Sequence, residues 1–233
     1  MNRNILKYIA VIAMLCDHIA LAFVGMDNPL GIAMRVFGRL TAPIMCYFLV
    51  EGYMHTRSRK KYGARLLVFA LISQIPFAYF LAGGIRVLKF NMMFTLFLCF
   101  MMLVTIEKIE SRVLKFILVT GLYWLCSYCD WGVVAPLWVM AFILCRNDKN
   151  KLCLVYALVC VFWVARATTM AVYDGGMWYD GLWQAGSLAF IPFIYLYNGK
   201  SGKSNKFSKW FFYAFYPIHI LIIAVIYRNG LFR

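Results

Sequence analysis

Residues 5–24 read ILKYIAVIAMLCDHIALAFV, an apolar run that contains an acid and an imidazole side by side, Asp17 and His18. Twenty residues of α-helix extend about 30 Å, the thickness of the hydrocarbon core of a bilayer. The run is therefore predicted to cross a membrane, with Asp17 and His18 inside it. Ionisable side chains are costly there, so the pair either has a function or joins neighbouring helices through hydrogen bonds.

The rest of the chain is similarly apolar. Of its 233 residues, 64% are hydrophobic and 18% are aromatic, and the mean hydropathy is +0.75. In a soluble domain only about half of the residues are apolar. We therefore expect an all-α, polytopic integral membrane helix bundle, organised as a single transmembrane domain over residues 1–233.

Apolar segments alternate with short polar connections along the whole chain. Nine of them are predicted to be transmembrane helices, although those in the middle of the chain are short for a full crossing. The predicted segments are 5–24, 32–54, 64–82, 92–106, 113–127, 132–145, 152–171, 182–197 and 210–227.

The formal net charge is +15, and its distribution indicates the topology. Most Lys and Arg residues lie at the amino terminus and in every second connection, including the polar connector 200–206. The opposite side has few basic residues, among them Arg86 and Arg233, and several aspartates. The positive-inside rule predicts a cytoplasmic amino terminus and an outer carboxyl terminus. Basic loops of this kind indicate orientation, so no nucleic-acid partner is expected.

The eight cysteines fall mostly in apolar runs, where a free thiol behaves as a small hydrophobic group. Cys126 and Cys129 have the spacing of a metal or redox pair. No second pair and no clustered histidine accompany them, and we expect no metal site.

The second predicted span contains Arg35 and Arg39, which are four residues apart and share a helix face. Arginine stays charged at any depth, so each guanidinium needs a carboxylate, backbone carbonyls or an anionic ligand. Asp17 is the nearest acidic candidate. For Arg35 an equal alternative is that its side chain reaches the outer interface.

The ninth predicted span contains Tyr216, Pro217 and His219. His219 and His18 both lie near the middle of the membrane if the spans are placed correctly. Each alone could be a satisfied core histidine. Together with Asp17 and Arg39 they favour a wet, reactive cavity, in which a neutral imidazole serves as a general base.

Polar residues also cluster at the cytoplasmic end of the second span. His55, Thr56 and Arg57, followed by Tyr62 and Arg65, could hold a phosphorylated ligand through charge-assisted hydrogen bonds, or form an ordinary basic loop. At the start of the fourth span, Asn91 and Thr95 could line a cavity or join helices.

Taken together, these motifs resemble the TraX family over most of the chain, most strongly at its two ends. The residues that carry the resemblance are Leu6-Lys7, Met14-Leu-Cys-Asp17-His18, Arg35-Val-Phe-Gly38-Arg39-Leu-Thr-Ala-Pro43, Glu51-Gly-Tyr-Met-His55-Thr56-Arg57, Lys61-Tyr62-Gly-Ala-Arg65 and Phe215-Tyr216-Pro217-Ile218-His219. The named member of that family acetylates the amino terminus of a conjugative pilin. The family is distantly similar to membrane-bound acyltransferases.

The resemblance implies an acetyltransferase that takes acetyl groups from cytoplasmic acetyl-CoA and delivers them to an extracytoplasmic peptide or cell-surface glycan. His18 or His219 would be the base or transient acyl carrier, Asp17 would orient it, and Arg39 would stabilise the oxyanion. The residues expected to hold acetyl-CoA are Arg35, His55, Thr56, Arg57, Tyr62, Arg65, Asn91, Thr95 and Tyr216.

A small-solute or proton-coupled transporter would use the same residues as a relay, and it is the main alternative. No inverted repeat is visible in the sequence. A scaffold without catalytic activity would leave the buried charges unexplained.

Overall fold

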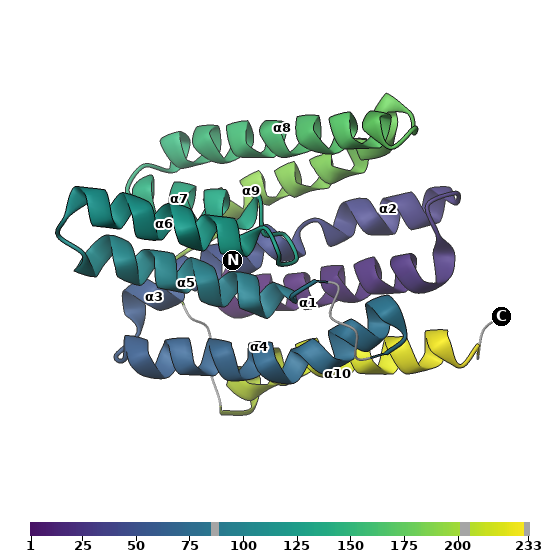
Figure 1. The fold of residues 1–233 in the computed structure, drawn as a ribbon, viewed down its shortest axis with the longest axis horizontal. Coiled ribbons are helices and arrows are strands. Elements are labelled where there is room, and N and C mark those ends of the chain that lie inside the picture. The colour runs from purple at the N-terminus through teal and green to yellow at the C-terminus, as the bar shows by residue number, and fades with distance from the viewer. Residues whose placement is uncertain (85–88, 201–205, 231–233) are drawn as a thin grey trace. The chain divides into compact units, whose positions relative to one another are not determined.

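The computed structural model describes residues 1–84, 89–200 and 206–230 (Figure 1). Across these ranges the regular elements are helices, apart from one isolated β-bridge between Phe90 and Cys129. The expected all-α class is thereby confirmed for the described residues. Arg86, Arg233 and residues 201–205 of the expected connector lie outside them.

The described part of the chain contains α-helices, one π-helical turn and one 3-10 helix. In chain order they are α1 (Arg3–Ile19), the π-helix η1 (Ala20–Val24), α2 (Pro29–Gly38), α3 (Thr41–His55), α4 (Arg59–Ala82), α5 (Met92–Lys108), α6 (Arg112–Cys126), α7 (Ala135–Leu144), α8 (Lys149–Tyr173), the 3-10 helix η2 (Trp178–Phe190), α9 (Ile191–Leu196) and α10 (Lys206–Arg228).

Five helical segments in the described ranges are long and apolar enough to cross a membrane, which marks a membrane protein. They are Arg3–Val24, Pro29–His55, Arg59–Ala82, Lys149–Tyr173 and Trp210–Arg228. The helices α5, α6 and α7 match predicted spans but have only 17, 15 and 10 residues. The number of crossings therefore stays a prediction.

The second predicted span is broken into α2 and α3, which the apolar pattern did not indicate. The break falls at Arg39 and Leu40. Pro43 is the cause that the sequence offers, because it has no N–H to donate to the carbonyl group of Arg39 in a continuous helix. The Leu40 N–H instead donates to Phe37 over 3.2 Å, a tighter 3-10 turn.

The eighth predicted span also differs from a single α-helix. It begins as the 13-residue 3-10 helix η2 and continues for six residues as α9. Runs of 3-10 helix longer than three or four residues are uncommon. Close packing of Gly181 and Gly186 against neighbouring backbone accompanies this conformation.

The described residues form two compact units, and the expectation of one domain is a prediction that this division does not test. One unit comprises Met1–Met45 and Ala141–Phe212, and the other comprises Cys46–Met140 and, among the described residues, 213–230. We describe each unit by itself. The first contains α1, α2, α8, η2 and α9, and we call it the Asp17 unit. The second contains α4, α5, α6 and most of α10, and we call it the His219 unit.

In the Asp17 unit, α2 packs on α1, and η2 packs on both α2 and α8 (Figure 1). The amino terminus of Met1 donates to the Leu196 carbonyl group over 2.7 Å. The Tyr195 hydroxyl donates to Asn150 Oδ1, also over 2.7 Å. One end of this unit therefore brings together the starts of α1 and α8 and the end of α9.

In the His219 unit, α5 packs on α4 and α6. Phe69 of α4 stacks on Tyr213 of α10 with ring centroids 4.9 Å apart. Further along both helices, Arg228 Nη2 donates to the Phe80 carbonyl group over 3.0 Å. Because both contacts advance toward the carboxyl ends, α4 and α10 run in the same direction.

Candidate functional site

The carboxylate of Asp17 in α1 binds two guanidinium groups of α2. Arg35 Nη1 donates to Asp17 Oδ2 over 3.0 Å, and Arg39 Nη2 donates to Asp17 Oδ1 in a short ion pair. The three side chains are 14%, 13% and 6% exposed, in the order Asp17, Arg35, Arg39. The pairing of both arginines with Asp17, which the sequence suggested, is present.

Trp183 of η2 covers both arginines. Its ring centroid lies 4.4 Å from Arg35 Cζ and 4.5 Å from Arg39 Cζ, which is cation–π geometry. Arg39 Nε also donates to the Arg35 carbonyl group over 3.3 Å. We call Asp17, Arg35, Arg39 and Trp183 the Asp17 cluster.

Small residues let three elements meet at this cluster. A Cβ atom on Gly38 would lie 2.5 Å from both Cβ and Oδ1 of Asp17, so α2 can approach α1 only because residue 38 is glycine. A Cβ atom on Gly186 would overlap the Val36 carbonyl group, which has the same consequence for η2 and α2.

His18 follows Asp17 in α1, and its ring is oriented by the backbone. Nδ1 lies 2.8 Å from the Met14 carbonyl oxygen. A carbonyl oxygen only accepts, so Nδ1 carries a proton and Nε2 is the basic nitrogen of the neutral ring. This carbonyl, rather than the Asp17 carboxylate alone, can therefore set the tautomer that a general base requires.

His219 has the same arrangement in the His219 unit. Its Nδ1 donates to the Phe215 carbonyl group over 2.7 Å, and its ring stacks on Phe215 at 4.6 Å. Tyr216, one turn earlier, is buried, and its hydroxyl oxygen accepts from the Met92 N–H over 3.3 Å. Tyr216 thus joins α10 to the start of α5.

Asn91 and Thr95 form hydrogen bonds to neighbouring elements in this structure. Asn91 caps α5 by accepting from the Met93 N–H over 2.9 Å, and its amide donates to Ala70 and Gln74, each over 2.8 Å. Thr95 donates to the Asp130 carbonyl group. These bonds attach α5 to α4 and to the loop between α6 and α7.

The predicted phosphate-binding residues surround the connection between α3 and α4. His55 and Arg57 are exposed, whereas Thr56, Tyr62 and Arg65 are half-buried. His55 Nδ1 donates to the backbone carbonyl group of Glu51 over 2.8 Å, and Arg65 Cζ lies 5.7 Å from the Tyr62 ring centroid. The connection thus presents Arg57 at the surface between two anchored flanks.

Glu107 is a residue of this region that sequence reasoning missed. Its carboxylate accepts from the Tyr53 hydroxyl and forms an ion pair with Arg59. Arg59 Cζ lies 4.5 Å from the Tyr53 ring centroid. An acid at the end of an apolar run beside a basic loop was the available signal. The group joins the end of α3, the start of α4 and the end of α5.

The cysteine pair does not present a reactive thiol. Cys126 and Cys129 are 0% and 2% exposed, and burial raises the pKa of the Cys129 thiol to about 12. Within the described ranges, no group of three or more His, Cys, Asp or Glu side chains is placed to hold a metal ion.

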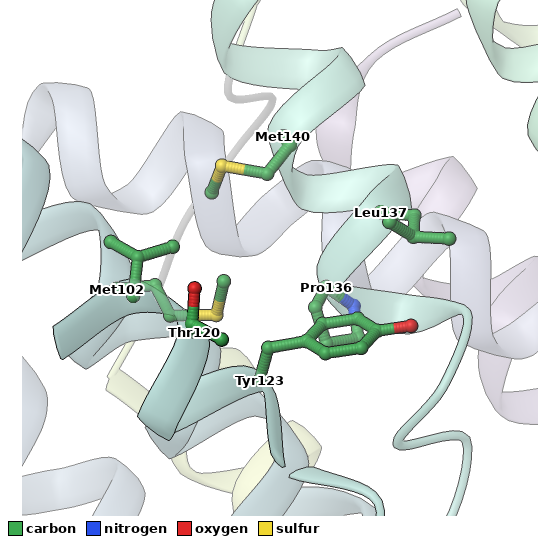
Figure 2. Close-up of a pocket in the computed structure, with 7 residues that line it drawn as sticks. Met102, Thr120, Tyr123, Pro136, Leu137 and Met140 are labelled. Carbon is green, nitrogen blue, oxygen red and sulfur yellow. The ribbon is translucent and has the colours of Figure 1, made fainter. Parts of the chain in front are cut away.

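The described part of the structure contains a cavity whose lining includes none of the predicted site residues. It has a volume of about 260 Å³ between α5, α6 and α7 (Figure 2). Met102, Val119, Pro136, Leu137 and Met140 make its lining mostly apolar. The hydroxyl of Tyr123, which also lines it, donates to the Val133 carbonyl group over 3.2 Å.

Trp183 was also missed, because a single tryptophan in an apolar run gives no sequence signal for a partner. The fold and this site define a polytopic membrane protein with a buried acid–arginine cluster next to a histidine whose ring orientation is set.

The comparisons with known proteins assign this class to a family. The family described as TraX protein matches residues 2–227, and the chain belongs to the TraX family. It is similar to a probable fimbrial assembly protein, FimC of serogroup H1, from Dichelobacter nodosus. The two are 35% identical over 173 residues, which cover 68% of this chain and 70% of that protein. No solved structure matches the chain.

Proposed function

We propose that this protein is a membrane-embedded acetyltransferase of the bacterial cytoplasmic membrane, with acetyl-CoA as the acyl donor. Membership of the TraX family supports the class of activity. The observation that carries the proposal is the Asp17 cluster, in which the buried Arg39 and the half-buried Arg35 meet one carboxylate beside His18. Groups so costly to bury are expected to serve the reaction.

The chemistry assigns a role to each group. An uncharged amine or a hydroxyl of the acceptor attacks the thioester carbonyl carbon, and its proton passes to Nε2 of His18 or His219. The C–N or C–O bond forms, the C–S bond breaks, and CoA leaves as a thiol after taking up that proton. Arg39 stabilises the negative charge that develops on the carbonyl oxygen. Asp17 holds Arg39 and Arg35 in place.

Acetyl-CoA is proposed to bring its phosphates to the connection between α3 and α4. Arg57 is exposed there and can form charge-assisted hydrogen bonds with phosphate oxygens. Arg59, by contrast, is paired with Glu107. We assign Arg57, His55 and Thr56 to phosphate binding, whereas the bonds of Asn91, Thr95 and Tyr216 support a role in holding helices together.

The proposed topology has nine crossings, a cytoplasmic amino terminus and an outer carboxyl terminus. In the Asp17 unit, the starts of α1 and α8 share one end with the end of α9, as alternating crossings require. In the His219 unit, α4 and α10 run in the same direction, as the third and ninth crossings should. Basic loops at the proposed inner ends support the same orientation.

The acceptor is proposed to be the amino terminus of a fimbrial or pilus subunit. The support is the name of the Dichelobacter nodosus relative, a probable fimbrial assembly protein, together with the pilin-acetylating activity known in the TraX family. A cell-surface glycan is the other acceptor consistent with the proposal.

The direct test is transfer of labelled acetyl from acetyl-CoA by purified protein in liposomes. Subunit peptides with free or blocked amino termini serve as acceptors, and CoA release is measured in parallel. Label in the free peptide alone is the expected result. Label in a cell-surface glycan would identify the glycan, and not the subunit peptide, as the acceptor. Failure of acetyl-CoA to raise the melting temperature or to release CoA would contradict the acetyltransferase and favour a transporter.

A further inference from the structure

In the 3-10 helix η2, every third residue lies on the same face, because 3-10 geometry has 3.0 residues per turn. Each such row of residues along the helix is called a column. One column faces α8. Gly181 lies against the backbone of Thr168, Gln184 accepts from Trp163 Nε1 over 3.0 Å, and the Ser187 carbonyl group accepts from Tyr156 over 2.6 Å.

A second column faces α2. Trp183 covers the guanidinium groups of Arg35 and Arg39, and Gly186, three residues later, lies against the Val36 carbonyl group. The absence of a side chain at Gly186 therefore sets how close the column comes to α2, and this approach places the indole ring over both arginines.

An ordinary α-helix would not keep both columns. With 3.6 residues per turn, residues three apart are rotated by about 60°, so a column of three would turn through about 120°. Gly181, Gln184 and Ser187 could then not all face α8 while Trp183 and Gly186 face α2. The unusual conformation of η2 thus serves the placement of Trp183.

We propose that Trp183 is a positioning residue, which holds Arg35 and Arg39 as a pair against Asp17 through the face of its indole ring. This role is distinct from those of Asp17 and the arginines, because Trp183 acts through them. Its consequence for catalysis rests on the proposed function, but its effect on the two arginines does not.

The test measures the rate at which phenylglyoxal modifies individual arginines in the full-length protein in liposomes, with peptides quantified by mass spectrometry. Trp183→Leu is expected to raise the rates at Arg35 and Arg39 about fivefold or more, because the ring contacts are lost. Trp183→Phe keeps an aromatic face and should stay within about twofold of the original protein.

Two controls separate positioning from a general loss of structure. Trp178→Leu removes an exposed tryptophan from the same 3-10 helix and should change neither rate. Arg166, whose Cζ lies 5.6 Å from the Trp163 ring, reports on the rest of the unit and should keep its rate in every variant. If Trp183→Leu unfolds, shown by a parallel rise at Arg166, Trp183→Met replaces it.

The proposal is overturned if the rates at Arg35 and Arg39 in the non-aromatic variant stay within twofold of the original, or if Trp183→Phe loses protection equally. With acetyl-CoA turnover, Trp183→Leu should lower kcat about tenfold with KM for acetyl-CoA unchanged. Absence of turnover in the unsubstituted protein would refute the proposed function, while the arginine rates still decide the role of Trp183.

Discussion

Gly38 of α2 lies so close to Asp17 of α1 that a Cβ atom on residue 38 would stand 2.5 Å from Asp17 Oδ1. The ion pairs of Asp17 therefore depend on the close approach of α1 and α2. If α2 moved away from α1, the carboxylate would lose contact with Arg35 and Arg39. A glycine in an apolar run is thus part of the site.

Gly38→Ala is expected to lower the free energy of unfolding by about 1–3 kcal/mol, because the added methyl group has no space. The matched control is Gly121→Ala in α6, where a Cβ atom meets nothing within 4 Å. That change should be neutral or stabilise by up to about 1 kcal/mol. Thermal unfolding in detergent measures both, and equal melting temperatures would contradict the close approach.

Asp17→Asn is expected to destabilise the protein by about 3–5 kcal/mol, because two buried guanidinium groups lose their carboxylate. Asp27→Asn changes an exposed aspartate in the loop before α2 and should cost less than about 0.5 kcal/mol. Denaturant or thermal unfolding compares the two. If Asp17→Asn and Asp27→Asn unfolded at the same midpoint, the ion pairs of Asp17 would contribute little to stability.

His18→Ala and His219→Ala test which imidazole reacts. Loss of the general base should lower kcat about 10²- to 10⁴-fold while the protein still inserts into the membrane. His55→Ala, at an exposed position, should instead raise KM for acetyl-CoA. Turnover of labelled acetyl-CoA separates the three. Normal turnover in both His18→Ala and His219→Ala would exclude an imidazole mechanism.

Arg57→Ala and Arg59→Ala should have opposite signatures, although the residues are two apart. Arg57 is exposed, so its loss should raise KM for acetyl-CoA about tenfold without affecting stability. Arg59 is paired with Glu107 and stacked on Tyr53, so its loss should cost about 1 kcal/mol and leave KM unchanged. Kinetics gives KM for acetyl-CoA and thermal unfolding gives the stability of both variants. A raised KM in Arg59→Ala with a loss of stability in Arg57→Ala would refute the assignment of Arg57 to phosphate binding.

The nine crossings can be tested with alkaline phosphatase fusions, which are active only outside the cytoplasm. A fusion after Glu110, between α5 and α6, should be inactive, and one after Asp130, between α6 and α7, should be active. The short helix α6 would then cross the membrane. If both fusions report the same side, α6 does not cross and the number is smaller.

Several features could be predicted from the residues in order. Apolar runs and their spacing indicated the positions of the helices, because hydrophobic length is a local property. Arg35 and Arg39 shared a face and required a carboxylate, and Asp17 was the nearest candidate. The motifs at both ends of the chain indicated the TraX family, and the family match confirms it.

Other features depended on contacts between distant segments. Trp183 lies far along the chain from Arg35 and Arg39, and the packing of η2 against α2 brings its ring onto them. Likewise, the sequence left open whether Asn91 lines a cavity or joins helices, and only the structure shows its amide bound to Ala70 and Gln74. An apolar pattern does not record which polar atoms are satisfied across helices.

The sequence by itself determined the class of protein, the family and the residues that are costly to bury, because composition, hydropathy and charge are properties of local stretches. The tertiary structure alone decided which costly groups meet. It joined Asp17 to two arginines under one indole ring, oriented His18 by a backbone carbonyl and paired Glu107 with Arg59. Such pairings depend on close approaches between helices, and side-chain volumes at positions such as Gly38 and Gly186 set those distances.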